Sequence, residues 1–248
     1  MNLLDARAAQ SEVEWLAIED PTGGETGFSV PSIYDDRVWL LHSIYQFDLP
    51  IDLTMDELER LRGEAGEPPL IINGVNITES TTATNIPFGL AGSPGAGWHR
   101  RLWADLLAES GRKLGEGQAF RPSFQWIPDR TSAGIQGPPE GSLDREMRDA
   151  LWDVLSGGED PECFAHYSSV ARFVQRDWKE LPEIMVYRGR LSELAAISEE
   201  RRSTPNNVWP VDRSWLLYTD YDLSGTQIGG STSLIHALEN DERFEVLR

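Results

Sequence analysis

The sequence predicts an α+β fold with a mostly antiparallel sheet flanked by several helices. Segments with helical periodicity and segments with strand periodicity are both present and are mixed along the chain. Strand-like segments follow one another without the regular helical crossovers that join parallel strands, which favours antiparallel pairing. Hydrophobic residues make up 40% of the chain and nine residues are tryptophan. A composition of this kind indicates a packed core rather than a disordered chain.

Two apolar segments and one helix signal stand near the N-terminus. The apolar segments are residues 13–18 and 37–47. The second fits either a buried helix or a buried strand, because periodicity does not separate the two. Thr54 and Glu57 form a capping box, in which each side chain can bond the other residue's backbone amide. We therefore expect a helix that begins there and ends at Gly63.

Residues 64–97 are rich in Gly, Pro, Ser and Thr around one apolar island at residues 70–72. A structureless segment of this length is uncommon within a compact domain, so a short hairpin is an alternative to a surface loop. We favour a loop insertion. The chain is then expected to form a single α+β domain over residues 1–248. The alternative is an N-terminal half, 1–127, and a C-terminal half, 128–248.

Two further helices are predicted in the middle of the chain. The first covers residues 98–110, where Trp98, Leu102 and Leu106 share one face, and it ends at Gly111. The second is expected to be capped by Ser142 and to end at the Gly157-Gly158 pair. Its apolar residues follow the helical period: Leu143, Met147, Ala150, Leu151, Val154 and Leu155.

Strands are predicted on either side of the second helix. Residues 120–127 alternate apolar with polar side chains, which is typical of a half-buried strand. Residues 134–141 form a Pro/Gly-rich turn region. After the helix, residues 163–167 and 183–188 are further expected strands.

The last 44 residues are predicted to form one continuous α+β unit. Residues 205–213 are expected to be a turn-rich lead-in, and residues 214–222 and 226–228 to be strands. Gly229-Gly230-Ser231 then opens a helix that ends near Asn240. Residues 244–247 are expected to be the last strand.

The net charge bounds the kinds of partner. Lys and Arg number 22 against 41 Asp and Glu, which gives a net charge of −19. Such a field repels phosphate backbones and anionic lipids, so we expect no nucleic-acid or membrane partner. It favours a basic protein partner, although general acidity is more often a solubility trait. There is no run of about 20 apolar residues and no signal-peptide pattern, so a cytoplasmic location is expected.

Reactive side chains give weak signals. Cys163 is the one cysteine, so no disulfide within the chain and no cysteine-based zinc site can form. We expect Cys163 to be a buried, inert thiol and His42 to be a hydrogen-bonded core or boundary residue rather than a base. His236 is expected to face solvent. No metal ion and no cofactor are expected, because the four histidines lack metal-ligand spacing.

The strongest candidate functional surface is Arg213, Asp220, Asp222, Thr226 and Ser231. Asp220 and Asp222 stand two apart, so on a strand their carboxylates would share a face and could hold Mg²⁺ or act as acid and base. The helix start at Ser231 could hold an anion. The alternative, which we favour, is that these residues end a strand and cap a helix.

The C-terminal motif has a family resemblance. Its residues read Trp-Pro-x-Asp-Arg-Ser-Trp from Trp209, Thr-Asp-x-Asp-Leu from Thr219, then Thr226 and Gly-Gly-Ser from Gly229. This motif resembles the C-terminal signature of an uncharacterised family common in actinobacteria. Weaker matches lie at residues 34–42, 98–111, 138–143 and 187–191. The resemblance implies an intracellular bacterial protein, supplies no activity or catalytic residue, and makes residues 64–97 look like an insertion.

Three functions are compatible with these observations. The leading hypothesis is a non-catalytic acidic protein-binding module, immunity-like or regulatory, which is motivated by charge, aromatic content and the lack of a coherent catalytic set. The first alternative is a metal- or phosphate-dependent enzyme that uses residues 213–231. The second is an oligomeric scaffold with an aromatic interface at residues 98–126.

Overall fold

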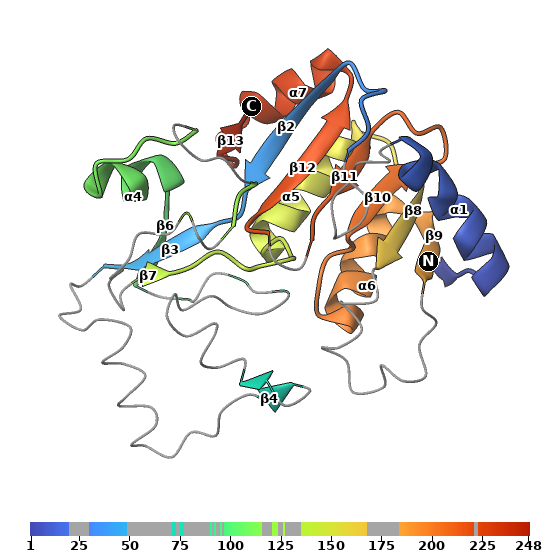
Figure 1. Ribbon diagram of the computed structural model, residues 1–248, viewed down its shortest axis with the longest axis horizontal. Helices are drawn as coiled ribbons and strands as arrows, with labels where there is room; N and C mark the ends of the chain where they lie inside the picture. The colour runs from blue at the N-terminus through green and yellow to red at the C-terminus, as the bar shows by residue number, and fades with distance from the viewer. Residues whose placement is uncertain are drawn as a thin grey trace.

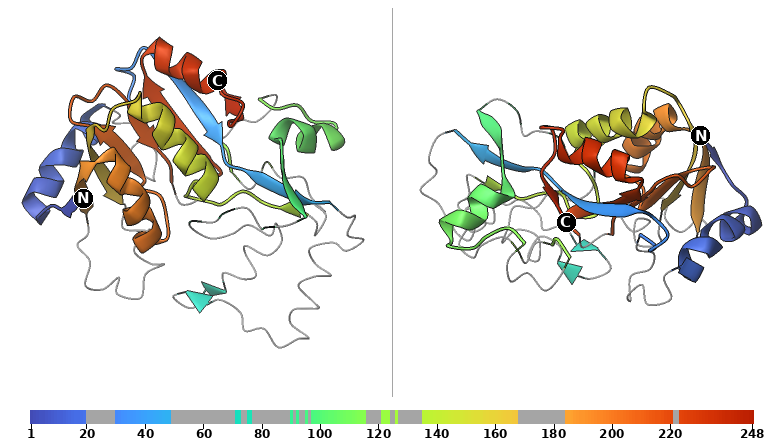
Figure 2. Two further views of the ribbon diagram at one scale, coloured as in Figure 1. Left: turned by 180° about the vertical axis from the view of Figure 1, so that it is seen from behind. Right: turned by 90° about the horizontal axis from the view of Figure 1, so that it is seen from above.

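A computed structural model gives the architecture of the chain (Figures 1 and 2). The residues that the structure describes are 1–19, 30–48, 71–72, 75–76, 90, 92, 95, 97–115, 121–123, 126, 135–167, 184–220 and 223–248. The helix expected over residues 54–63 lies outside them.

The main sheet has eight strands, and every neighbouring pair is antiparallel. In spatial order they are β1 (Asn2–Leu3), β9 (Met185–Arg190), β8 (Glu162–Tyr167), β10 (Asn207–Pro210), β11 (Leu216–Tyr218), β12 (Gly225–Gly230), β2 (Asp36–Leu41) and β13 (Val246–Leu247). The predicted α+β fold with a mostly antiparallel sheet is therefore confirmed.

Two smaller sheets accompany the main one. The first has the order β6 (Trp98–Arg101), β3 (Ile44–Phe47), β7 (Ile135–Gln136). The second pairs β4 (Ile71–Ile72) with β5 (Val75–Asn76), so a short hairpin is present within residues 64–97. The ambiguous apolar segment at residues 37–47 forms strands β2 and β3, which run from the main sheet into the first small sheet (Figure 1).

Helices cover both faces of the main sheet, as the view from above in Figure 2 shows. On one face lie α5 (Arg145–Ser156), α6 (Leu194–Arg201) with the short 3₁₀ turn η5 (Leu191–Glu193), and α7 (Thr232–Glu239). On the other lies α1 (Ala6–Glu19). Helix α4 (Trp103–Glu109) packs with the β3 sheet.

Strand alternation separates the two cores. On β8, Cys163, Ala165 and Tyr167 point to the core under α5 and α7, whereas Phe164 points to the core under α1. Successive side chains of a strand point to opposite faces, so a strand buried on both faces is apolar throughout. This explains why residues 163–167 could be predicted as a strand without a polar face.

The helix predicted over residues 98–110 is wrong in its first part. Trp98–Arg101 forms β6, because it pairs with β3 and the Trp98 ring lies 5.4 Å from the Phe47 ring. Leu102 is extended and 44% exposed, and α4 begins after it. The predicted end is confirmed, since Gly111 adopts a φ of +73° just beyond the helix.

Three other predictions differ from the structure. Asp144, not Ser142, caps α5: its Oδ1 accepts the Met147 amide at 2.8 Å, because Asp144 directly precedes the first helical residue. The expected lead-in at residues 205–213 contains buried strand β10, whose pairing with β8 and β11 overrides the turn propensity of its Asn and Pro. Residues 134–141 likewise contain β7.

The strand predicted over residues 120–127 is wrong where the structure describes it. Residues 121–123 are irregular, and Trp126 lies in a short 3₁₀ turn. The Trp126 indole packs edge-on against Trp103 with ring centres 6.1 Å apart, so aromatic packing rather than strand pairing accounts for its burial. Among the described residues, no helix is both long and apolar enough to span a membrane.

Candidate functional site

The structure places the predicted candidate residues at two opposite ends of strands β11 and β12. Arg213 precedes β11 and Asp220 follows it. Because β12 is antiparallel to β11, Thr226 lies near the Asp220 end and Ser231 near the Arg213 end. Five residue steps along β12 correspond to roughly 17 Å between Thr226 and Ser231. The four candidates therefore form two separate pairs, and Asp222 lies outside the described residues.

Arg213 is a turn residue held against helix α1. Its φ is +55°, and its amide donates to the Pro210 carbonyl at 2.9 Å, which closes the turn between β10 and β11. Its guanidinium carbon lies 4.5 Å from the centre of the Trp15 ring, within the range of a cation–π contact. The rest of the Arg213 side chain is exposed to solvent, so this residue joins the β10–β11 turn to α1.

Ser231 is the N-cap of helix α7. Its hydroxyl oxygen accepts the Leu234 amide at 3.3 Å, and the helix ends at Asn240 as expected. This bond is the ordinary role of a serine at a helix start. The side chain is exposed, so capping explains why this residue stands here.

Thr226 belongs to a buried network that includes His42. His42 Nδ1 lies 2.7 Å from the Pro139 carbonyl oxygen, and Nε2 lies 2.9 Å from Thr226 Oγ1. A carbonyl oxygen can accept but not donate, so Nδ1 carries the proton and Nε2 accepts from the threonine hydroxyl. Complete burial lowers the pKa of His42 to about 4, so the ring is neutral near pH 7.

The His42 network also fixes the junction of the two sheets. Trp103 Nε1 donates to the His42 carbonyl at 2.9 Å, which ties α4 to the end of β2. The predicted role of His42 as a hydrogen-bonded core residue is confirmed by this geometry. With both ring nitrogens bonded, the side chain has no free nitrogen for catalysis or metal binding.

Asp220 ends a buried polar row that the sequence analysis missed. Tyr218 OH donates to Asp220 Oδ2 at 3.3 Å, and Arg121 Nη1 donates to the Tyr218 oxygen at 3.2 Å. His166, Asn207 and Tyr218 stand opposite one another on β8, β10 and β11, so they share one face of the sheet. His166 Nδ1 and Asn207 Oδ1 are 3.0 Å apart.

This row is buried at every position, with exposures of 1–4% for His166, Asn207, Tyr218 and Asp220. Burial lowers the pKa of His166 to about 4, so this ring is also neutral near pH 7. His166 and Tyr218 fall in two different predicted strands, so the sequence alone gives no contact between them. Strand register, which no local pattern gives, brings these two residues together on either side of Asn207, which is 41 residues from His166.

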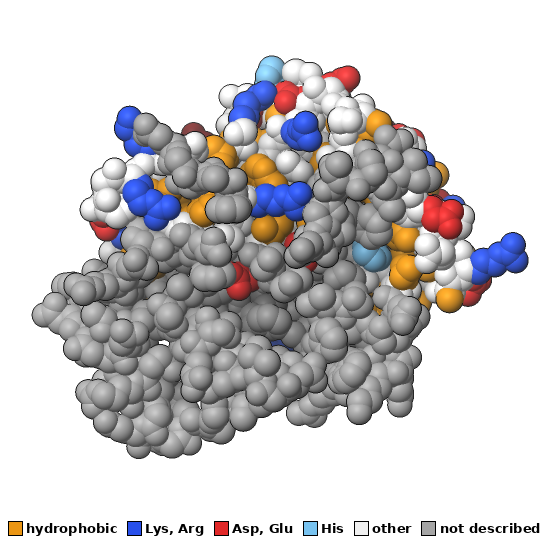
Figure 3. Space-filling model, in the orientation of Figure 1, with side chains coloured by type: hydrophobic (Ala, Val, Ile, Leu, Met, Phe, Trp, Pro, Cys, Tyr) orange, Lys and Arg blue, Asp and Glu red, His pale blue; other side chains and the backbone are white. Residues whose placement is uncertain are grey.

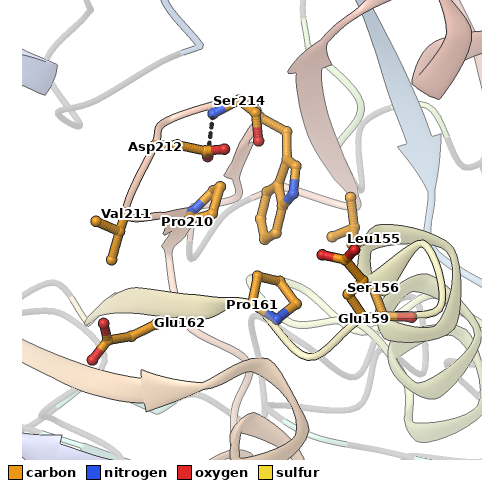
Figure 4. Close-up of a pocket in the computed structure, with 10 residues that line it drawn as sticks. Leu155, Ser156, Glu159, Pro161, Glu162, Pro210, Val211, Asp212 and Ser214 are labelled. Atoms are coloured by element: carbon orange, nitrogen blue, oxygen red, sulfur yellow. Dashed lines mark hydrogen bonds between the residues drawn. The ribbon is translucent and has the colours of Figure 1, made fainter.

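A pocket lies at the opposite end of the same strands, between the end of α5, the start of β8 and the β10–β11 turn (Figure 4). Its volume is about 480 Å³, within the usual range for a small-ligand or side-chain site. Among the described residues, its wall combines three carboxylates with apolar and small polar side chains and includes no basic residue. The lining residues are Leu155, Ser156, Glu159, Pro161, Glu162, Pro210, Val211, Asp212, Ser214 and Trp215.

The three carboxylates of the pocket differ in whether a basic residue neutralises their negative charge. Glu162 forms a bidentate ion pair with Arg188, with both N···O distances at 3.1 Å, and this arginine lowers the pKa of Glu162. Asp212 accepts the Ser214 amide at 3.0 Å, which closes the turn. In the part of the chain that the structure describes, neither Asp212 nor Glu159 has an ion-pair partner. The pocket is therefore negative.

Apolar side chains form the rest of the pocket. Trp215 is 6% exposed, whereas Val211 is 51% exposed and stands at the rim. The Trp215 indole N–H donates no hydrogen bond to any described residue. On the face drawn in Figure 3, by contrast, acidic, basic and hydrophobic side chains are interspersed over the described surface.

Cys163 lies behind the pocket wall and is unsuited to nucleophilic chemistry. Its side chain is buried, and its Sγ lies 3.6 Å from the Pro161 carbonyl oxygen. Burial, with smaller contributions from Asp160 and Asp212, raises the pKa of the thiol to about 12. Thiolate is the reactive form, so a raised pKa disfavours nucleophilic chemistry near neutral pH. The predicted burial of this thiol is confirmed.

Metal ligands do not gather in the described residues, where no group of three or more His, Cys, Asp or Glu side chains could hold an ion. Comparisons with protein-family models, with curated proteins and with solved structures found no match to this chain. A function is therefore inferred from the geometry of the structure, in which the two candidate features are the acidic pocket and the buried polar row of His166, Asn207, Tyr218 and Asp220.

Proposed function

We propose that the protein is a non-catalytic, acidic protein-binding module, immunity-like or regulatory, whose partner is a basic protein. The observation that supports this function best is the pocket between α5 and the β10–β11 turn, whose described lining has carboxylates and apolar side chains but no basic residue. Complementary charge accelerates association and excludes partners of like charge. A bacterial origin, a cytoplasmic location and membership of the resembled actinobacterial family are parts of the same proposal.

The placement of the predicted site residues favours binding over catalysis. Arg213 and Asp220 lie at opposite ends of β11, too far apart to act on one substrate atom. Thr226 and Ser231 already have structural bonds, to His42 and to the Leu234 amide. An enzyme of residues 213–231 would need these groups to converge around one reacting centre.

The scaffold alternative has less support than binding through the pocket. An interface at residues 98–126 would require exposed aromatic side chains. Trp103 and Trp126 are 1% and 4% exposed and pack against each other. They stabilise the β3 sheet and are not available to a second copy of the chain.

Affinity capture from a bacterial lysate, at about 50 mM and about 500 mM NaCl, tests this function. The expected result is a basic protein that is retained at low salt, is released at high salt, and forms a complex with the chain when both are purified. A variant with two exposed acids removed that do not line the pocket, Glu14→Gln with Glu242→Gln, should still capture it. Turnover of a metabolite with no partner at either salt would contradict the proposal.

A further inference from the structure

We propose that the pocket between α5 and the β10–β11 turn binds one arginine side chain of the partner, together with the backbone carbonyl of that residue. This inference rests on the proposed function and specifies which side chain of the basic partner contacts the pocket. It follows from three features of the pocket wall: apolar side chains for the methylene stem, separated carboxylates for the guanidinium, and an indole N–H that donates to no described residue.

The apolar part of the wall fits the stem of a long basic side chain. Leu155, Pro161 and Pro210 come from three different elements and line one cavity. Long charged side chains cover their methylene groups with apolar surface while the charged head stays near polar groups. A small inorganic cation has no such stem and would leave this surface in water.

The carboxylates favour a cationic head. Glu159 follows α5 and Asp212 lies in the β10–β11 turn, so the two approach the cavity from different elements (Figure 4). Neither has an ion-pair partner in the described part of the chain, whereas Glu162 is already held by Arg188. An incoming cation would therefore gain two charge-assisted hydrogen bonds without displacing an existing ion pair.

The Trp215 indole N–H is available to bond an acceptor on the occupant. This side chain lines the cavity, is 94% buried (6% exposed), and donates to no described residue. Guanidinium and ammonium groups are donors and cannot accept this bond. A peptide carbonyl can. The acidic wall attracts a cation and the unused donor can bond a peptide carbonyl, so together they favour a basic residue within a peptide over a metal ion or a polyamine.

Arginine fits the wall better than lysine does. A guanidinium is a planar fork with five N–H donors, so it can bond two separated carboxylates while its flat face packs on proline or an indole. An ammonium is a compact point charge that remains strongly hydrated. Since the carboxylates come from two elements and apolar side chains line the same cavity, we assign the pocket to arginine.

A titration with a single-residue probe tests the assignment directly. The probe is N-acetyl-arginine amide, and the signal is the indole N–H resonance of Trp215 in isotope-labelled protein, identified with a Trp215→Phe variant. The expected result is a saturable shift of this resonance. N-acetyl-citrulline amide, which has the same shape without the charge, should bind about tenfold more weakly or worse. The lysine analogue should also bind more weakly.

Matched variants locate the interaction. Asp212→Asn keeps an oxygen that can accept the Ser214 amide, and Glu159 is exposed, so the double variant with Glu159→Gln should fold; its circular dichroism and melting temperature verify this. It should lose about tenfold or more in affinity for the arginine probe. The charge-matched control Glu14→Gln/Glu242→Gln should bind the probe as the unmodified protein does.

Several results would overturn the assignment: no shift of the Trp215 resonance, equal shifts with citrulline or lysine probes, or equal loss in the charge-matched control. The inference and the proposed function fail separately. A basic partner that binds the double variant with unchanged affinity removes the arginine pocket and leaves the binding module. Specific arginine binding by a chain that captures no protein removes the binding module instead.

Discussion

Replacing His42 with glutamine should reduce the dependence of folding stability on pH. The His42 ring is fully buried and has a pKa near 4, because burial disfavours the charged ring. In the unfolded chain the pKa of histidine is about 6.5. Between these values the unfolded state binds more protons than the folded state, so the free energy of unfolding falls as the pH falls. Glutamine does not titrate and removes this contribution.

The size of the effect follows from the two pKa values. Stability is unaffected by His42 well above pH 6.5 and decreases by up to about 1.4 kcal/mol per pH unit below it. Between pH 7 and pH 5 the loss is about 2 kcal/mol for one histidine of this kind. His166 has the same lowered pKa of about 4 and should contribute a similar loss. Below about pH 4 the contribution of each ring levels off.

Urea unfolding, followed by tryptophan fluorescence at pH 7 and pH 5, measures this difference. The wild type should lose about 2 kcal/mol more than the His42→Gln variant over this interval. His236→Gln is the control, because this ring is 59% exposed and should behave as the wild type does. The carboxylates titrate equally in all three proteins and cancel in the comparison. An unchanged pH dependence in His42→Gln would refute the buried, neutral state of this ring.

Three further substitutions test contacts that hold the fold together, each by thermal or urea unfolding. Asp144→Ala removes the hydrogen bond at the start of α5 and should cost about 1 kcal/mol; an unchanged stability would contradict its role as N-cap. Glu245→Ala removes the carboxylate that accepts the first two amides of α4 and should cost about 1–2 kcal/mol. Gly229→Ala places a methyl group against Val30 and should cost about 1–3 kcal/mol, whereas a neutral result would show that the strand can shift.

Local signals in the sequence were enough for elements whose neighbours in sequence are also their neighbours in space. The apolar period of α5, the glycine after it and the serine before α7 are all encoded within one or two turns. The apolar segment at residues 163–167 predicted β8 because both of its faces are buried. These elements determine the fold class, which explains why the α+β prediction is correct.

Contacts between distant segments account for the errors. The sequence around Trp98 is compatible with a helix, but Trp98 lies in β6 because this segment pairs with β3. That strand is about 50 residues away along the chain, so no local pattern reveals the pairing. Asn207 and Pro210 have turn propensity, yet two flanking strands make β10 a buried strand. Trp126 packs against Trp103 from an irregular segment. Intrinsic propensity is weak compared with strand pairing and burial, so tertiary context decides these segments.

The candidate site was predicted less completely than the fold. The motif at residues 209–215 does contain the β10–β11 turn, and its Asp212 and Trp215 line the pocket. The other half of the pocket comes from residues 155–162, and no sequence pattern indicates that the two segments meet. Likewise, Asp220 was identified, whereas His166 and Asn207 join its row through strand register alone.

The salt dependence of the affinity between the purified chain and its captured partner tests the binding function most directly. Titration calorimetry at several ionic strengths measures it. Affinity that falls about tenfold or more between about 50 mM and 500 mM NaCl is the result expected for a basic protein on an acidic surface. An affinity that does not change with salt, or a chain that binds no protein and turns over a metabolite, would contradict the account.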